Sequence, residues 1–73
     1  MSTKHNNPTL ENVADDEPIF VLRANDELAP DYIDMWADHL ERAGGNAQKV
    51  GGARQVADDM REWQRLNGSK LPD

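Results

Sequence analysis

Residues 30–41 read Pro-Asp-Tyr-Ile-Asp-Met-Trp-Ala-Asp-His-Leu-Glu, and this stretch decides the fold class. Its apolar residues recur at the spacing of one face of a helix: Ile33, Trp36, Ala37 and Leu40. Proline is well suited to the first turn of a helix, and the Gly44-Gly45 pair is typical of a helix end. The sequence therefore predicts a helix that begins near Pro30 and ends before Gly44.

A second helix is predicted from about Ala47 to Leu66. Asn46 precedes it and is a suitable N-cap. Its apolar stripe consists of Val50, Ala53, Val56, Ala57, Met60 and Trp63. Gly51 and Gly52 lie inside this range, and each costs about 1 kcal/mol relative to alanine. Two alternatives follow: the first turn frays, or the helix starts near Ala53.

The two apolar stripes should face each other in an antiparallel helical hairpin, with Trp36 and Trp63 as the largest buried side chains. The expected fold class is mainly α, a small α+β protein. Residues 17–68 would form a single strand-helix-helix domain. A disordered polar and acidic tail (residues 1–16) would precede it, and a C-terminal tail (residues 69–73) would follow.

One short β-strand is predicted before the helices. It consists of the apolar residues Ile19, Phe20, Val21 and Leu22, and Pro18 stands at its first position, where a missing N–H does least harm. No second strand is apparent in the sequence. We therefore expect this association strand to pair with a copy of itself or with the sheet edge of another protein. The alternative is an extended segment laid across the two helices.

Composition excludes several classes of protein. With 73 residues the chain forms one domain at most, and without cysteine it has no disulfide or thiolate metal site. The first residues contain no apolar signal segment, and the longest apolar run, Ile19–Leu22, is too short to cross a membrane. These features predict a soluble cytoplasmic protein.

The net charge of −6 is distributed unevenly. Residues 11–41 contain ten acidic residues against Arg23 alone, which gives −9, whereas residues 42–73 carry +2 and Lys4 adds +1. An acidic half repels phosphate and attracts basic surfaces. The expected partner is therefore a basic protein surface, with no direct binding of nucleic acid and no membrane contact.

Four carboxylates of the first helix form an acidic ridge: Asp31, Asp34, Asp38 and Glu41. At about 100° per residue they lie within about 80° of one another, roughly opposite the apolar stripe. Like charges at these spacings destabilise a helix by about 0.2–0.5 kcal/mol per pair, and no base is interleaved. The ridge is therefore either an ordinary solvated face or a recognition surface, with Asp26 and Glu27 as auxiliary contacts.

The second helix has a different charge pattern. Arg54 with Asp58, Asp58 with Arg61, and Glu62 with Arg65 are spaced for ordinary pairing along one helix. These pairs predict a structural role for its charges. The contrast favours a recognition role for the acids of the first helix.

No catalytic centre is predicted. His39 follows Asp38 directly, and adjacent residues on a helix do not face each other. The glycine pairs match no phosphate-binding loop, because no Lys-Ser or Lys-Thr follows them. We expect no enzyme activity, no metal site and no cofactor.

Residues 16–23, Asp-Glu-Pro-Ile-Phe-Val-Leu-Arg, resemble a segment found in short proteins encoded by phages and prophages, most of them of unassigned function. The resemblance extends through Asp26, Leu28-Ala29 and Trp36-Ala37, and more loosely to Trp63-Gln64. It implies a phage origin and a small strand-plus-helices fold. The chain is also similar in kind, by size and charge, to anti-CRISPR inhibitors, which often occupy the basic DNA-binding channels of type I surveillance complexes.

These observations lead to a functional hypothesis. The chain would be a phage-encoded inhibitor that acts as a DNA mimic, binding a host nucleic-acid-binding protein such as a type I CRISPR effector complex. An alternative is a homodimeric phage structural, assembly or regulatory protein whose strand mediates association. A third is an antitoxin or small regulator whose tail folds on its partner.

Overall fold

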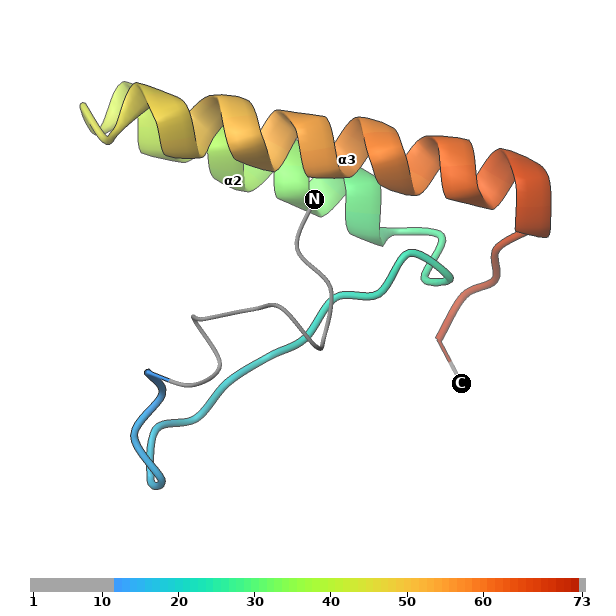
Figure 1. Cartoon of the computed structure of the whole chain (residues 1–73), viewed down its shortest axis with the longest axis horizontal. Helices are drawn as coiled ribbons and strands as arrows, with labels where there is room; N and C mark the ends of the chain where they lie inside the picture. The colour runs from blue at the N-terminus through green and yellow to red at the C-terminus, as the bar shows by residue number, and fades with distance from the viewer. Residues whose placement is uncertain (1–11, 73) are drawn as a thin grey trace.

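The computed structural model describes residues 12–72 and contains two helices that lie side by side and antiparallel (Figure 1). Helix α2 spans Ala29–Arg42 and helix α3 spans Ala47–Asn67. The helices contact each other along the hairpin, and residues 12–28 form a long loop on one side of it (Figure 1). The predicted helical hairpin is confirmed. Residues 1–11 of the predicted tail lie outside the described residues.

Helix α2 begins without a side-chain cap at its own N-cap residue, Leu28. Asp26 supplies a substitute two residues earlier, because its Oδ1 atom accepts a hydrogen bond from the Leu28 N–H at 2.8 Å. This is the usual local role of an aspartate in a turn. Pro30 then occupies the first helical turn, where a missing N–H leaves no intrahelical bond unmade.

The helix–helix connection is short because two glycines close α2. The Gly44 N–H donates to the Glu41 carbonyl at 3.1 Å and the Gly45 N–H to the Leu40 carbonyl at 2.9 Å, which is a Schellman motif. Gly44 has a φ of 78°, in the left-handed region that favours glycine. A Cβ atom at Gly45 would clash with the Leu40 side chain, so this position also requires glycine.

Helix α3 starts where Asn46 caps it. The Asn46 Oδ1 atom accepts from the Gln48 N–H at 2.8 Å and from the Lys49 N–H at 3.3 Å, as predicted. The helix runs through Gly51 and Gly52, so the alternative start near Ala53 is wrong. An added Cβ at either glycine would meet no atom within 4 Å. Intramolecular packing therefore does not require glycine at these two positions.

The core of the hairpin is a seam of small residues. The fully or almost fully buried apolar side chains are Ala29, Ala37, Val50 and Ala57. The expectation that the tryptophans form the buried centre is wrong, because Trp36 is 54% exposed and Trp63 is 43% exposed. A pair of helices has a single interface, and only a narrow stripe of each helix lies inside it. Within residues 12–72, side chains on the flanks of that stripe have no third helix or sheet to cover them.

The predicted β-strand is also wrong. Among residues 12–72 no strand forms, and the β-like pairing is a single parallel bridge between Asp26 and Lys70. Residues 19–22 instead run as an extended segment of the long loop (Figure 1). An isolated strand has nothing to pair with, so its backbone groups are left without a ladder.

The loop before α2 is held by the C-terminal part of the chain. The Gln64 Nε2 atom donates to the Ala24 carbonyl at 3.0 Å and to the Asp26 carbonyl at 2.9 Å. The Lys70 N–H donates to the Asn25 carbonyl at 3.0 Å. Residue 70, which the sequence places in a C-terminal tail, is therefore part of the folded structure.

Candidate functional site

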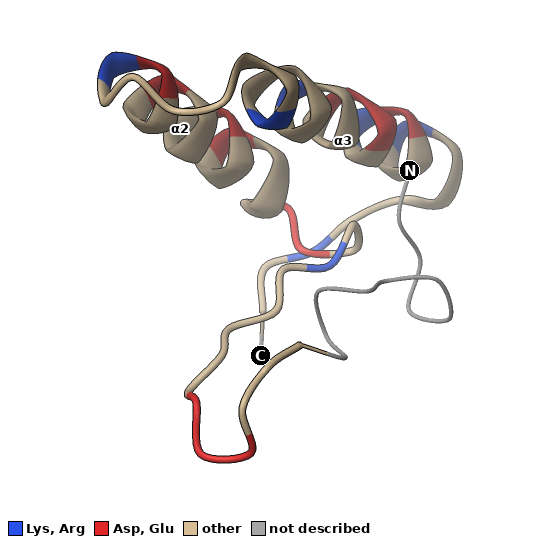
Figure 2. Ribbon diagram, turned by 60° about the vertical axis from the view of Figure 1, so that its left-hand side comes forward, with Lys and Arg blue, Asp and Glu red and all other residues tan. Residues whose placement is uncertain are grey.

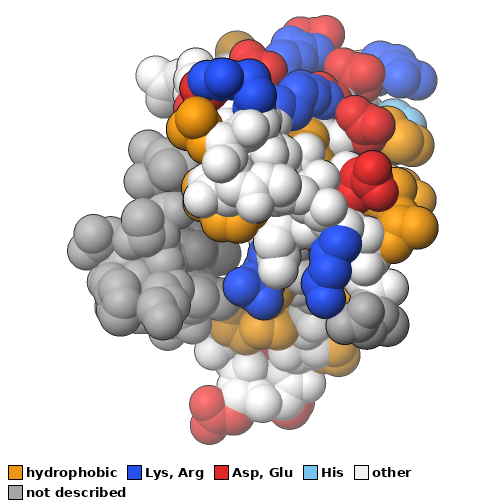
Figure 3. Space-filling model, turned by 90° about the vertical axis from the view of Figure 1, so that its right-hand side faces the viewer, with side chains coloured by type: hydrophobic (Ala, Val, Ile, Leu, Met, Phe, Trp, Pro, Cys, Tyr) orange, Lys and Arg blue, Asp and Glu red, His pale blue; other side chains and the backbone are white. Residues whose placement is uncertain are grey.

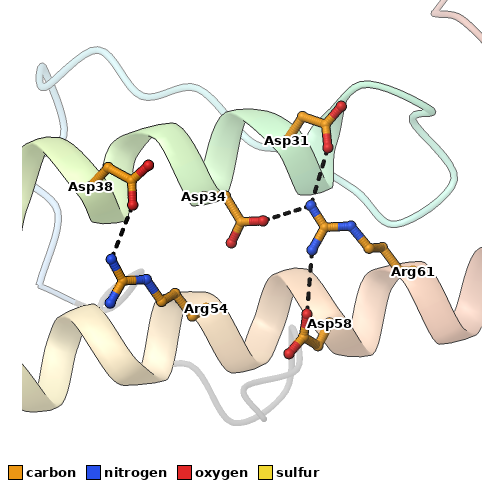
Figure 4. Close-up of polar contacts among 6 residues, drawn as sticks. All are labelled: Asp31, Asp34, Asp38, Arg54, Asp58 and Arg61. Atoms are coloured by element: carbon orange, nitrogen blue, oxygen red, sulfur yellow. Dashed lines mark hydrogen bonds and ion pairs between the residues drawn. The ribbon is translucent and has the colours of Figure 1, made fainter.

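Arg61 of α3 connects the two helices at the start of α2. Its Nη2 atom lies 2.6 Å from the Asp34 Oδ2 atom and 3.1 Å from the Asp31 Oδ1 atom (Figure 4). Its Nη1 atom lies 3.3 Å from the Oδ1 atom of Asp58 on its own helix. One guanidinium thus serves three carboxylates.

Arg54 repeats this arrangement two turns earlier in α3. Its Nη2 atom lies 3.0 Å from the Asp38 Oδ1 atom (Figure 4), and its Nη1 atom lies 3.2 Å from the Glu41 Oε2 atom. Together the two arginines and five acids form an ion-pair ladder, which consists of Asp31, Asp34, Asp38, Glu41, Arg54, Asp58 and Arg61.

The expectation that the acidic ridge lacks counter-charges is wrong, because all four of its acids pair with arginines of α3. The structure confirms the Asp58–Arg61 and Glu62–Arg65 pairs within α3, but Arg54 pairs with α2 instead of Asp58. Figure 2 shows acidic positions recurring along α2 and both signs along α3. On the face in Figure 3, charges of both signs are likewise intermingled at the top.

The ladder still carries excess negative charge. Its five carboxylates and two guanidinium groups leave a net charge of −3. The outermost acid, Asp31, has a side chain that is 82% exposed, so it remains accessible to a further cation. The ladder therefore joins the two helices and keeps a net negative charge at the surface.

Hydrogen bonding in these pairs shifts pKa values in the expected directions. The pKa of Arg61 is raised by its hydrogen bonds to Asp34 and Asp31, and that of Arg54 by its bonds to Glu41 and Asp38. Farther along α3, the Arg65 guanidinium lowers the pKa of Glu62. These shifts favour the charged form of each group.

The two auxiliary acids differ in their surroundings. Asp26 is partly buried and is occupied by its hydrogen bond to the Leu28 N–H. Glu27 is exposed, and its backbone N–H donates to the Lys70 carbonyl at 2.9 Å. Within residues 12–72 the Glu27 carboxylate makes no ion pair, so it is available to a partner.

A large hollow lies on the other flank of α2. It has a volume of about 670 Å³ and is lined by Phe20, Leu22, Asp26, Leu28, Tyr32, Ile33, Trp36 and Pro72. We call it the apolar hollow. At about 100° per residue, Trp36 projects from the side of α2 roughly opposite Asp38, so the hollow and the ladder flank the helix seam on opposite sides.

The large hydrophobic side chains that line the apolar hollow are unusually exposed to solvent. Phe20 is 86% exposed, and Tyr32 is 52% exposed. Contiguous exposed apolar surface of this kind marks sites of protein–protein or ligand contact. Aromatic residues in particular are enriched where protein partners bind.

The extended segment of residues 19–22 forms one side of this hollow. Phe20 and Leu22 line it, whereas Ile19 and Val21 do not. Val21 is 63% exposed. This alternation is that of an extended chain, in which successive side chains point to opposite sides. Two of the four predicted association residues, Phe20 and Leu22, therefore belong to the hollow, although the segment does not form a strand.

Within residues 12–72 no group of three or more His, Asp or Glu side chains is arranged to hold a metal ion. In the same part of the chain, neither helix has the length and apolar character needed to cross a membrane. Comparisons with models of protein families, with curated proteins and with solved structures found no match. The function must therefore be inferred from the surface of this molecule.

Sequence reasoning missed both the ladder arginines and the apolar hollow. A signal for the arginines exists: Arg54 and Arg61 are seven residues apart, as are Asp31 and Asp38. Equal spacing on two antiparallel helices places such residues opposite each other. For the hollow no comparable signal exists, because its lining comes from the loop, from α2 and from the C-terminal segment.

Proposed function

We propose that this chain is a non-catalytic inhibitor that docks on a basic, nucleic-acid-binding host protein and blocks its binding of DNA. The apolar hollow is the observation that carries the proposal, because a small protein that exposes Phe20, Tyr32 and Trp36 together gains stability when a partner covers them. Aromatic anchors surrounded by charged residues are the common anatomy of a protein–protein interface.

Charge supports the class of partner. Residues 11–41 carry −9 and include both the acids of α2 and the acids of the loop beside the hollow. A field of this sign accelerates encounter with a positively charged protein and repels nucleic acid. Proteins that bind DNA present such basic surfaces to phosphate. A phage-encoded inhibitor of a type I CRISPR effector complex fits this description.

The ion-pair ladder changes the role proposed for the acidic ridge, because arginines of α3 already pair with its acids. Asp34 and Asp38 are engaged by arginines, so a partner would have to compete for them. Asp31 and the unpaired Glu27 are the accessible acids at the start of α2. We therefore assign the main anchoring contacts to the hollow and the electrostatic steering to the acids around it.

The test compares two tryptophans of similar exposure. The tagged protein is used to capture its partner from a host lysate, and the partner is then titrated with Trp36→Ala and Trp63→Ala variants. Trp36 lines the hollow and Trp63 does not. Trp36→Ala should weaken binding by about tenfold or more, since aromatic anchors commonly contribute about 2 kcal/mol or more. Trp63→Ala should bind normally. Equal affinities for the wild type and both variants would contradict the proposal.

The charge contribution has its own matched control. The Asp26→Asn, Glu27→Gln double variant removes two charges while the asparagine can still cap Leu28. Asp59→Asn removes a charge on α3 that makes no ion pair with any residue in the range 12–72. The double variant should associate more slowly at low salt, and this difference should shrink at high salt. The captured partner should also lose its DNA when the wild-type protein is added.

The homodimer remains the second candidate, because Ile19, Phe20 and Val21 are apolar and exposed. Self-association through this face would bring together two acidic halves of −9 each. Such like-charge repulsion opposes a dimer at low salt. Sedimentation at low and high salt decides between the candidates, and a dimer that is stable at low salt would favour the second.

A further inference from the structure

We infer that the partner docks as an extended basic segment, which adds as a strand along residues 19–22 and inserts apolar side chains into the hollow. The inference depends on the proposed function, because it describes how a protein partner would occupy the same surface. Three independent features of the described residues support it: free backbone groups, the geometry of the hollow, and charge.

The backbone of residues 19–22 is available for pairing. Within residues 12–72, none of the N–H or C=O groups of these four residues makes a backbone hydrogen bond. The neighbouring part of the loop differs, because Asn25 and Glu27 both pair with Lys70. An extended, apolar, unpaired stretch of backbone is a template for an added strand, whose main-chain hydrogen bonds supply affinity.

The hollow suits the side chains of such a strand. Residues Phe20 and Leu22 line it from the segment, and Tyr32 and Trp36 line it from α2. A volume of about 670 Å³ accommodates two or three apolar side chains of one strand face. A helix already pairs its own backbone groups, so the unpaired backbone of residues 19–22 offers it no hydrogen bonds. An extended occupant is therefore favoured over a helical one.

Charge selects a basic occupant over a second copy of the chain. Asp26 lines the hollow, and the exposed Glu27 follows it directly in the sequence. Lysine and arginine residues of a docked segment would be attracted to these two acids. A second copy would instead present its own −9 half. Charge complementarity therefore favours a basic segment.

The experiment uses defined peptides as probes. The first is a peptide of about nine residues in which lysine alternates with valine or leucine, a length that covers the four-residue segment. The second has glutamate in place of every lysine. The protein carries Trp63→Phe, so that the fluorescence of Trp36 reports on the hollow. The basic peptide should bind at least about tenfold more tightly than the acidic peptide.

Backbone pairing is tested with two N-methylated forms of the basic peptide. One is methylated at the odd-numbered residues and the other at the even-numbered residues. Only one edge of a strand faces its partner, so one register should lose about tenfold or more in affinity while the other keeps it. Hydrogen exchange on the complex should also show new protection at alternate amides of residues 19–22. Trp36→Ala should abolish binding of the basic peptide, whereas Trp63→Ala should not.

The other possible outcomes refute either this inference or the proposed function on which it depends. Binding of the basic peptide without protection of residues 19–22, and without any effect of N-methylation, would refute strand addition and leave the proposed function standing. No binding of the basic peptide at about millimolar concentration would also refute the inference. A dimer whose association buries Trp36 would assign the hollow to a second copy. A captured partner indifferent to Trp36→Ala would refute the proposed function itself.

Discussion

The Nη2 atom of Arg61 lies 2.6 Å from the Oδ2 atom of Asp34, across the interface of the two helices. Seven residues earlier in α3, Arg54 makes the equivalent contact with Asp38, farther along α2. From the first contact to the second, the residue numbers rise along α2 and fall along α3, as expected for antiparallel helices. The ladder therefore favours one antiparallel register of the hairpin over a register shifted by a turn.

Charge reversal tests the role of the ladder in stability. In Arg54→Glu, the new carboxylate faces Asp38 and Glu41, so the thermal midpoint should fall. The compensating exchange Asp38→Arg in the same chain should recover part of the loss. Thermal melts of the three proteins measure both effects, and high salt should reduce the differences because the pairs are exposed. An Arg54→Glu variant as stable as the wild type would show that the ladder contributes nothing.

Gln64 holds the loop against α3 through two hydrogen bonds to backbone carbonyls. Gln64→Glu removes both donated hydrogen bonds and directs a carboxylate at the Ala24 and Asp26 carbonyls. We expect a loss of about 1–3 kcal/mol in the free energy of unfolding. Urea denaturation measures it, with Gln55→Glu as a control of the same chemistry, since Gln55 donates a single exposed hydrogen bond to Asp59. A loss no larger than that of the control would contradict this role.

The alanine seam predicts which core substitutions are harmful. Ala57 is fully buried, so Ala57→Leu should force the helices apart and cost about 1–3 kcal/mol. Trp63 is 43% exposed, and Trp63→Ala should cost less than the about 3–5 kcal/mol of a fully buried aromatic residue. Urea melts of both variants test the pair of expectations. A loss of about 3–5 kcal/mol for Trp63→Ala would instead place its indole in the core.

Alanine at the internal glycines of α3 should stabilise the protein. Each added methyl group meets no atom within 4 Å, and alanine reduces the conformational freedom of the unfolded chain. Gly51→Ala and Gly52→Ala should each raise the free energy of unfolding by about 0.5–1 kcal/mol. Gly45→Ala is the contrasting control and should destabilise, because its methyl group would clash with Leu40. Thermal unfolding distinguishes the three variants.

The Glu62–Arg65 pair predicts a pH dependence at the end of α3. The pKa of Glu62 is lowered by Arg65, so the pair stabilises the folded state above the ordinary glutamate pKa of about 4.3. This contribution should disappear as the pH falls through the lowered value. Titration of Glu62 by NMR should show that Arg65→Gln raises its pKa toward the ordinary value. An unchanged pKa would exclude the pair in solution.

Local sequence features were sufficient to predict the two helices, the end of the first and the start of the second. The N-cap Asn46 and the terminating Gly44-Gly45 pair act within a few residues, through hydrogen bonds that the neighbouring backbone always offers. The apolar stripes predicted the interface in part: Ala37, Val50 and Ala57 are buried, whereas Trp36 and Trp63 are about half exposed. Bulk charge and the lack of cysteine, which are properties of composition alone, limited the classes of function.

Tertiary structure alone decided what surrounds each side chain. Arg54 and Arg61 find their partners on the other helix because the hairpin brings α2 and α3 into register, and periodicity within one helix does not express that proximity. Trp36 is exposed because two helices provide a single interface, which small residues fill. The apolar hollow follows from the same cause, since three distant segments meet beside α2 and no further element of residues 12–72 covers the surface between them.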